Sequence, residues 1–270
     1  TVTDTAGAVA FELSSMTGDE LDNATDVNVV GGTINVANAA LVQSIDAYDN
    51  IDSAYVIDDS AGSVLGDTGT ILDGGVAGVN VVGGPVGAGI GSELSALDGD
   101  LQELSGYSSD ISFTVSDDAS AIAGVLAQGD ELNNADDVNV VGSTIDVAAA
   151  DAVQDITRYD AVASGYVIED SAGSVLGDTG TILDSGVAHV DVNSIASANV
   201  GVALGSLEDS LEAGYSSDIS FTVSDDASSI AGVLAQGDEL NNAEDVDVVG
   251  GTIDVAAADA VQDITRYDAV

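Results

Sequence analysis

The residues of this sequence whose types and spacing could do chemistry are acidic. A 23-residue segment, YVIDDSAGSVLGDTGTILDGGVA, begins at Tyr55 and returns at Tyr166 with only two changes. Each copy carries three aspartates on glycine-containing turns, namely Asp59, Asp67 and Asp73 in the first copy and Asp170, Asp178 and Asp184 in the second. Such oxygen donors suit Ca²⁺, which takes about six to eight oxygen ligands. The six aspartates are therefore candidate calcium ligands.

The same aspartates have a simpler interpretation. Asp59 and Asp170 directly precede a predicted helix, where a carboxylate can cap free backbone N–H groups. The sequence GDTG alone is typical of a turn. The EF-hand spacing D-x-[DN]-x-[DN]-G is absent. Specific Ca²⁺ ligation and helix capping thus both stay open, while diffuse binding of cations by the acidic surface is favoured.

Positively charged side chains are rare enough to be considered one by one. Arg158 and Arg266 occupy the same position in two copies of ITRYD. A local ion pair with a nearby aspartate would contribute only about 0.3–0.5 kcal/mol on a helix. Alternatively, each arginine contacts a neighbouring module or subunit, because a lone cation in an acidic field is strongly attracted. We therefore treat both arginines as candidate contact residues.

No arrangement typical of an enzyme stands out. His189 is the only histidine, and the equivalent position in the other copy of its segment is Gly78, so we interpret it as a variable surface position. Glycosidase-type catalysis needs one buried acid and one ionised acid at a defined separation. Acids that recur in every repeat as solvated caps do not suggest such a pair. We expect that the chain is not an enzyme.

The composition sets the chemical environment. The chain has 48 acidic residues against two arginines, a formal net charge of −46 and no cysteine. Such a surface repels nucleic acids, which bind through Lys and Arg. There is no apolar run of about 18 residues, so no membrane insertion is expected. Yet 45% of the residues are hydrophobic, enough for a core, and the acidic shell around it requires salt or divalent cations.

Internal repeats organise the whole chain. Residues 106–162 recur at 214–270, an offset of 108, and residues 1–48 form a more diverged copy. Each long repeat splits into two halves that open with an aromatic residue followed by x-[IV]-x-D-x-A-x-x-[IV]. Five modules result: module 1 (1–54), module 2 (55–112), module 3 (113–165), module 4 (166–220) and module 5 (221–270).

Periodicity inside a module predicts its elements. FTVSD and YVIED alternate apolar and polar residues as half-buried strands do. Ala227, Ile230 and Leu234 recur with a helical period after Asp225 or Asp226, either of which can be the N-cap. VDVVGGTIDV predicts extended segments around a Gly-Gly turn. A second helix is predicted over AAADAVQDITRYD, and in module 4 a helix is marked by apolar residues from 200 to 211.

Two architectures fit these elements. A strand-helix-strand-helix unit of about 55 residues cannot bury both faces of its strands alone, so stacked modules would form an α/β repeat array, an elongated solenoid-like rod with a parallel sheet. The recurring aromatics Tyr55, Phe113, Tyr166 and Phe221 would lie in its core. The alternative is a string of small β-rich domains. The absence of Pro-rich or Ser-rich linkers disfavours it, since the only proline is Pro85.

The segments FTVSDDASSIAG and DVDVVGGTIDVAAADA resemble the repeats of giant bacterial surface proteins. These include adhesin-like and haemolysin-type exoproteins of marine bacteria and cyanobacteria. The resemblance implies secretion, great length, a structural or adhesive role and often Ca²⁺. The glycine-rich G-G-x-G-x-D repeat of calcium β-rolls is absent, so that calcium site does not carry over.

From the repeats and the resemblance we expect an extracellular or cell-surface structural protein that associates end to end with itself in a fibre, sheath or layer. The alternative is a calcium-stiffened adhesin stalk whose binding domain lies elsewhere. The sequence starts at Thr1 and stops at Val270 inside a repeat. We interpret it as an excerpt of a longer polypeptide or a processed product.

Overall fold

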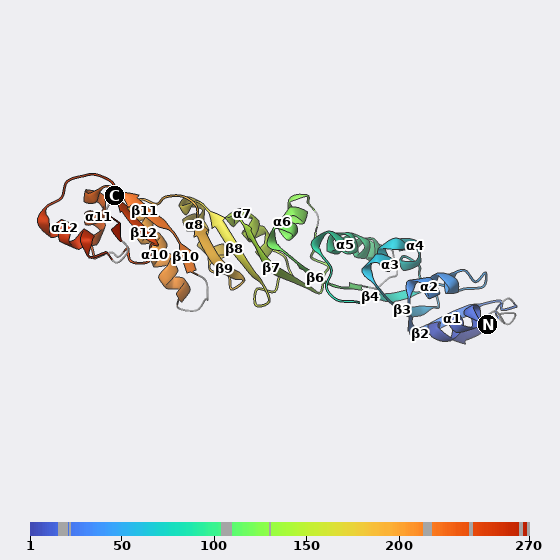
Figure 1. Ribbon diagram of the computed structural model, residues 1–270. Coiled ribbons are helices and arrows are strands. Elements are labelled where there is room, and N and C mark those ends of the chain that lie inside the picture. The colour runs from blue at the N-terminus through green and yellow to red at the C-terminus, as the bar shows by residue number, and fades with distance from the viewer. Residues whose placement is uncertain are drawn as a thin grey trace. The chain divides into compact units, whose positions relative to one another are not determined.

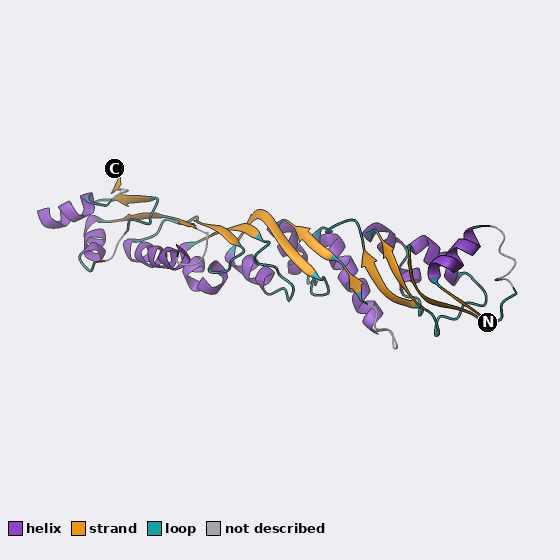
Figure 2. Cartoon of the chain, turned by 90° about the horizontal axis from the view of Figure 1, so that it is seen from below, coloured by secondary structure: helices purple, strands orange, loops and turns teal. Residues whose placement is uncertain are grey.

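The computed structural model describes residues 1–15, 21, 23–103, 110–129, 131–212, 218–237, 240–264 and 267–268. The chain divides into two compact units. The first comprises residues 1–117, 124–138 and 156–158, and the second comprises residues 118–123, 139–155 and 159–270. In each unit, strands and helices alternate along the chain (Figures 1 and 2). The α/β class expected from the sequence is therefore confirmed.

The elements are short and numerous. The helices of the described residues are α1 (Ala6–Ser14), α2 (Val36–Gln43), α3 (Ala61–Gly66), α4 (Thr68–Ile71), α5 (Ala88–Glu103), α6 (Ala119–Ala127), α7 (Val147–Gln154), α8 (Ala172–Gly177), α9 (Thr179–Ile182), α10 (Ala198–Glu212), α11 (Ala227–Leu234) and α12 (Val255–Gln262). The strands are β1 (Val2–Asp4), β2 (Val27–Ile34), β3 (Ala54–Asp59), β4 (Val76–Val81), β5 (Ile111–Ser112), β6 (Thr114–Asp117), β7 (Asp137–Ile145), β8 (Gly165–Asp170), β9 (Val187–Val192), β10 (Asp218–Ser220), β11 (Thr222–Asp225), β12 (Asp245–Val248) and β13 (Tyr267–Asp268).

The strands pair in parallel and in chain order. In the first unit the order is β1-β2-β3-β4-β5, and in the second β7, β8, β9 and β10 follow one another, as do β11, β12 and β13. Right-handed crossovers between strands added in this order place each connecting helix on the same face of the sheet. Because β2 pairs with β3 across the boundary between modules 1 and 2, separate β-rich domains do not describe these modules.

Burial alternates along the strands. In β3, Tyr55 and Ile57 are fully buried, whereas Val56 and Asp58 between them are partly exposed. This is the pattern of a sheet with one covered face. The recurring aromatics predicted for the core are all buried, with exposed fractions of 0% for Tyr55, 3% for Phe113, 0% for Tyr166 and 2% for Phe221. The other sheet face carries partly exposed polar and apolar side chains, such as Asp58 and Val56.

The helix predictions are confirmed for α11 and α10 but only in part for α12. Helix α11 begins at Ala227 with Asp226 as its N-cap, and Leu204 and Leu211 of α10 are buried as expected. The helix expected over AAADAVQDITRYD is too long, because α12 ends at Gln262 and Tyr267–Asp268 forms strand β13. That segment pairs with β12, which requires extended backbone.

Gly250 and Gly251 of the predicted segment follow β12, which pairs in parallel with β11 and β13, so no β-hairpin forms at this Gly-Gly pair and that prediction is wrong. In β2 the strand runs through Gly31 and Gly32, whose φ angles are 71° and 88°, and its pairing with β3 shifts there. The pair is therefore a bulge within one parallel strand. In β7 the second position is Ser143, which adopts a φ of 70° that favours glycine.

We expect Ser143→Gly to raise the free energy of unfolding by about 1 kcal/mol, because a side chain in the left-handed region costs roughly 1–2 kcal/mol. Urea unfolding of the variant and the wild type measures the difference. The matched reverse change, Gly32→Ser, should lower stability by a similar amount. Equal stability of Ser143→Gly and the wild type would show that the serine side chain is not strained.

Candidate functional site

Four aspartates at strand ends form the most regular polar feature of the structure. We call Asp59, Asp117, Asp170 and Asp225 the strand-end aspartates. Each accepts a hydrogen bond from the N–H of the first residue of a helix that precedes its strand in the chain. The donors are Val36 to Asp59 at 3.1 Å, Ala88 to Asp117 at 2.9 Å, Val147 to Asp170 at 3.2 Å and Ala198 to Asp225 at 3.0 Å.

These contacts join neighbouring modules. The first N–H groups of a helix have no partner within the helix, and a carboxylate there is favoured by the helix dipole. Burial raises the pKa of Asp59, but hydrogen bonds from the N–H groups of Ser60 and Val36 outweigh that effect and lower it. Asp170 follows the same pattern. The aspartate of the repeat signature is thus a joint between modules.

The N-cap assigned to Asp59 and Asp170 from the sequence is wrong. The caps of α3 and α8 are Ser60 and Ser171, whose side chains accept from the N–H groups of Ser63 and Ser174. A serine next to the aspartate offers its hydroxyl at the right distance for the local cap. The aspartate is thereby free to reach the preceding helix.

The other two aspartates of each candidate trio also accept hydrogen bonds inside the fold. Asp67 is the N-cap of α4 and accepts from the N–H of Thr70 at 3.2 Å and from its hydroxyl at 2.8 Å. Asp73 accepts from the hydroxyl of Tyr48 at 2.8 Å and from the N–H of Gly75 at 3.0 Å. In the second copy, Asp178 and Asp184 accept from the equivalent backbone N–H groups.

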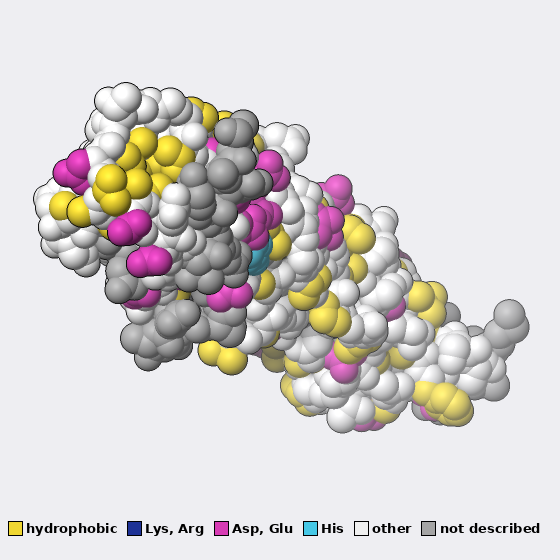
Figure 3. Space-filling model, turned by 60° about the vertical axis from the view of Figure 1, so that its left-hand side comes forward, with side chains coloured by type: hydrophobic (Ala, Val, Ile, Leu, Met, Phe, Trp, Pro, Cys, Tyr) yellow, Lys and Arg dark blue, Asp and Glu magenta, His cyan; other side chains and the backbone are white. Residues whose placement is uncertain are grey.

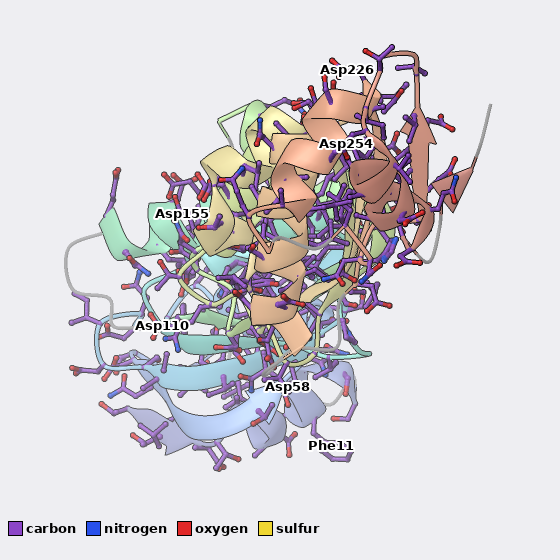
Figure 4. The ribbon with its side chains drawn as sticks, turned by 90° about the vertical axis from the view of Figure 1, so that its left-hand side faces the viewer. Phe11, Asp58, Asp110, Asp155, Asp226 and Asp254 are labelled. Atoms are coloured by element: carbon purple, nitrogen blue, oxygen red, sulfur yellow. The ribbon has the colours of Figure 1, made fainter. Side chains whose placement is uncertain are left out.

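The candidate calcium ligands are therefore dispersed over separate contacts. Within the described residues, no group of three or more His, Asp or Glu side chains is placed to hold a metal ion. Asp59 contacts α2, Asp67 contacts its own helix, and Asp73 contacts Tyr48. The structure does not bring the three together. Figure 4 labels two capping aspartates of the last module, Asp226 and Asp254, which bond the starts of α11 and α12.

Two tyrosine pairs, Tyr48 with Tyr55 and Tyr159 with Tyr166, each combine a half-buried ring with a fully buried one. Gln43 donates to the hydroxyl of Tyr55 at 2.8 Å and to the carbonyl of Thr70 at 2.9 Å. Gln154 makes the same two contacts in the second copy, to Tyr166 and Thr181. The Gln43–Tyr55 bond thus links module 1 to module 2, and the Gln154–Tyr166 bond links module 3 to module 4.

Burial, followed by the neighbouring tyrosine and aspartate, raises the pKa of Tyr48 and of Tyr159 well above the usual range. Ionised tyrosine would bring a second negative charge next to Asp73 or Asp184. The folded chain therefore holds these protons more tightly than the unfolded chain.

We expect stability to fall at alkaline pH because of these tyrosines. Unfolded tyrosine ionises near pH ~10, so below that value both states are protonated and the contribution is complete. Above it, the free energy of unfolding falls by about 1.4 kcal/mol per pH unit for each such tyrosine. The chain has no lysine or cysteine that would titrate in this range. Urea unfolding between pH ~9 and ~12 measures the free energy of unfolding of the wild type and of Tyr48→Phe. This free energy should fall less steeply with pH in the variant, and an identical pH dependence would contradict this account.

Asp98 is a buried acid that the sequence did not reveal. It lies on α5 with an exposed fraction of 2%, and it accepts from the N–H of Ile111 at 2.7 Å and from the amide of Gln102 at 2.7 Å. Burial raises its pKa, although the Ile111 N–H opposes the rise. Its position between Leu97 and Leu101 on the apolar stripe of the helix was the available signal.

His189 takes part in a polar cluster on the open sheet face. Its Nε2 lies 2.8 Å from the Asp191 carboxylate and 3.2 Å from the Ser220 hydroxyl. Ser220 also donates to Glu244 at 3.0 Å. A catalytic triad uses the two different ring nitrogens for acid and serine, whereas here one nitrogen meets both. Figure 3 shows the histidine, in cyan, beside acidic side chains.

The structure describes only one of the two candidate contact arginines. Arg158 is exposed, and within the described part of the chain its guanidinium forms no ion pair. The local pairing considered from the sequence is thus not formed there. Arg266 lies outside the described residues.

Two segments of identical sequence differ in burial. Residues 146–162 and 254–270 match at every position. Val147, at the start of α7, is 5% exposed, whereas Val255, at the start of α12, is 79% exposed. Asp170 of module 4 accepts a hydrogen bond from the Val147 N–H at the start of α7. Burial of a helix thus depends on the neighbouring module.

Comparisons with known proteins name no relative. No protein-family model matches the chain, and no curated protein matches it. Among solved structures, the carboxyl transferase domain of Rhizobium etli pyruvate carboxylase with oxalate aligns with 92% of this chain and 44% of its own, at 12% identity and a TM-score of 0.19. This chain therefore spans less than half of that structure, and such a TM-score carries no argument. No helix in the described residues has the length and apolar character needed to cross a membrane.

Proposed function

We propose that this chain is a non-catalytic structural segment of an extracellular or cell-surface protein. Its modules stack into an elongated solenoid-like α/β rod, and rods associate end to end in a fibre, sheath or layer. The identical copies then act as building blocks, because every unit repeats the same contact to its neighbour.

The observation that carries the proposal is the joint formed by the strand-end aspartates. It recurs at four module boundaries with distances between 2.9 and 3.2 Å. The candidate acids of the repeated segment accept hydrogen bonds from backbone N–H groups, either at this joint or at a local helix start or turn. Carboxylates that already accept hydrogen bonds from the backbone support a structural role better than a catalytic one.

The net charge of the chain favours a surrounding solution that is rich in cations. A net charge of −46 on 270 residues repels other copies unless ions screen it. Exposed Arg158 is available to contact an acidic neighbour, and we propose the same role for Arg266. The second candidate function, a calcium-stiffened adhesin stalk, is favoured by this charge and would bind Ca²⁺ diffusely or at Asp59, Asp67 and Asp73 and their copies.

Electron microscopy and sedimentation of the purified chain separate the two functions. Filaments or sheets of uniform width in ~1 M NaCl, where the Debye length is about 3 Å, support the structural proposal whether or not a chelator is present. Single rods that stiffen only with Ca²⁺ support the stalk. Compact single particles under all conditions would overturn both.

A triple variant and a matched control variant test whether Ca²⁺ binds at a specific site. Asp59→Asn, Asp67→Asn and Asp73→Asn together alter one copy, while Asp46→Asn, Asp49→Asn and Asp52→Asn remove the same charge from the adjacent loop. A Ca²⁺ response lost in the first variant and kept in the second identifies a specific site. Equal responses identify diffuse binding.

A further inference from the structure

A groove lies between helix α5 and the segment that follows α6. It has a volume of about 340 Å³, and its lining includes Ser92, Ser95 and Gly99 of α5 together with Glu131 and Asn134. These residues all belong to the first unit, and we call the feature the α5 groove. Small-molecule sites in proteins have volumes of about 300–1,000 Å³. The α5 groove is thus large enough for one small ligand.

One hydroxyl in this lining is buried and unpaired. Ser95 is 5% exposed, and among the described residues its Oγ has no hydrogen-bond partner. The counterpart of Ser95 in α10 is Gly205, and a Cβ there would lie 3.6 Å from Cβ of Asn242. Asn242 is the counterpart of Asn134, so the Ser95 side chain points toward Asn134 and into the groove. A buried polar group without a partner costs free energy, which a ligand atom recovers by bonding to it.

The second unit contains the same loop with a different helix against it. Residues 129–134 recur unchanged at 237–242. The side-chain amide of Asn242 donates to the backbone of α10 and, at 3.0 Å, to Oδ1 of Asp209. In the first unit the equivalent asparagine amide donates to the backbone of α5, but the counterpart of Asp209 is Gly99. The groove therefore lies where the second unit has a carboxylate that accepts from the loop amide.

These observations define the chemistry of an occupant. The Asn134 amide offers a hydrogen to an acceptor, which a simple cation does not carry, and the Glu131 carboxylate offers an acceptor to a donor. A net charge of −46 repels anions. A hydroxyl accepts and donates at the same time, so a neutral ligand with several hydroxyls suits both groups. Among the described residues, the lining has no apolar side chain larger than alanine, so an apolar ligand or a peptide side chain gains little by packing there.

We propose that the α5 groove binds one sugar residue. One ring hydroxyl takes the place of the Asp209 carboxylate and accepts from the Asn134 amide, and an adjacent hydroxyl donates to Glu131. The Ser95 hydroxyl bonds a third oxygen of the sugar. This site adds a ligand to a chain proposed above as structural, and it does not depend on association between copies.

Amide chemical shifts of the full chain, measured by NMR during titration, test the site. The probes are methyl α-D-glucoside, methyl β-D-galactoside and methyl α-D-mannoside, each added up to ~100 mM. At least one should bind with a dissociation constant of roughly 1–10 mM, because one sugar ring makes few contacts. The shifts should be confined to residues 92–99 and 131–134.

Gly99→Asp restores the carboxylate of the second unit and should weaken binding at least about tenfold. Its carboxylate should accept from the Asn134 amide as Asp209 accepts from Asn242. Gly89→Asp is the matched control, because it adds the same charge at an exposed position near the start of α5. Nothing lies within 4 Å of a Cβ added at either glycine, so both variants should fold, and Gly89→Asp should bind like the wild type.

The converse change should create a second site. Val202→Ser, Gly205→Ser and Asp209→Gly together give α10 the side chains that α5 presents to the identical loop. Binding to this triple variant should shift the amides of residues 240–242 as well as those of residues 131–134. Circular dichroism checks that α10 still forms, and a folded triple variant without the second set of shifts overturns the assignment.

The other outcomes are also distinct. No shift with any of the three glycosides, or equal binding by the wild type and Gly99→Asp, overturns the site. Glycerol, N-methylacetamide or tetramethylammonium that binds as strongly as the glycosides overturns the sugar assignment in favour of a small polyol, an amide or a cation. Filaments formed by a chain that binds no glycoside keep the proposed function and overturn this inference. A chain that binds a glycoside in the groove but never assembles does the reverse.

Discussion

Replacing Val147 by alanine should destabilise α7 by about 2 kcal/mol, whereas the same change at Val255 should leave α12 unchanged or slightly more stable. The two valines lie in identical sequences, so helix propensity and capping cancel in the comparison. Removing two buried methyl groups loses about 0.8 kcal/mol each plus a cavity term. At Val255, which is 79% exposed, there is little burial to lose.

Native-state hydrogen exchange measures both effects in one chain. Amides of α7 should exchange faster in Val147→Ala, and amides of α12 should keep their wild-type rates in Val255→Ala. The difference between the two variants is the contribution of a neighbouring module. Equal losses would mean that each module is stabilised from within, which would remove the basis for stacking.

Replacing Gly91 by alanine should lower the free energy of unfolding by about 1–3 kcal/mol through overpacking. A Cβ at this position of α5 would lie 2.5 Å from Cγ2 of Val115 and 3.3 Å from Cδ2 of Leu132. Both side chains are fully buried, so neither can move aside. Helix α5 approaches the next module this closely only because residue 91 has no side chain.

Gly99→Ala is the control on the same helix. Nothing lies within 4 Å of its added Cβ, so this variant should gain about 0.5–1 kcal/mol from the better helix propensity of alanine. Urea unfolding of the two variants should therefore move in opposite directions. A gain in both would show that α5 can withdraw from Val115 without cost. Gly201 of α10 faces Val223 in the same manner, so Gly201→Ala should repeat the loss in the second unit.

The sequence predicts local features of this fold well. The helical period of Ala227, Ile230 and Leu234 places α11 and limits its cap to Asp225 or Asp226, of which the structure uses Asp226, because capping and amphipathicity depend on residues only a few positions apart. The alternation in YVIED likewise places β8. These interactions are complete within one module.

Features that depend on a second segment were not predictable in this way. Gly31 and Gly32 have positive φ angles, which suit a hairpin turn as well as a bulge, and only the parallel pairing of β2 with β3 decides between them. Asp59 bonds Val36, 23 residues away, whereas local reasoning assigned it to the adjacent helix. The same holds for Asp98, whose bond to the Ile111 N–H explains an acid on an apolar stripe.

The joints made by the strand-end aspartates form in the order in which the polypeptide is synthesised. Each aspartate bonds a helix that was synthesised before it, as Asp170 bonds Val147. While the chain emerges from its N-terminus, every module is therefore completed by the one that follows, and the newest helix always has an unsatisfied start. Synthesis and folding then advance together by one module. Only the most recently synthesised module lacks its joint, and the earlier modules are complete.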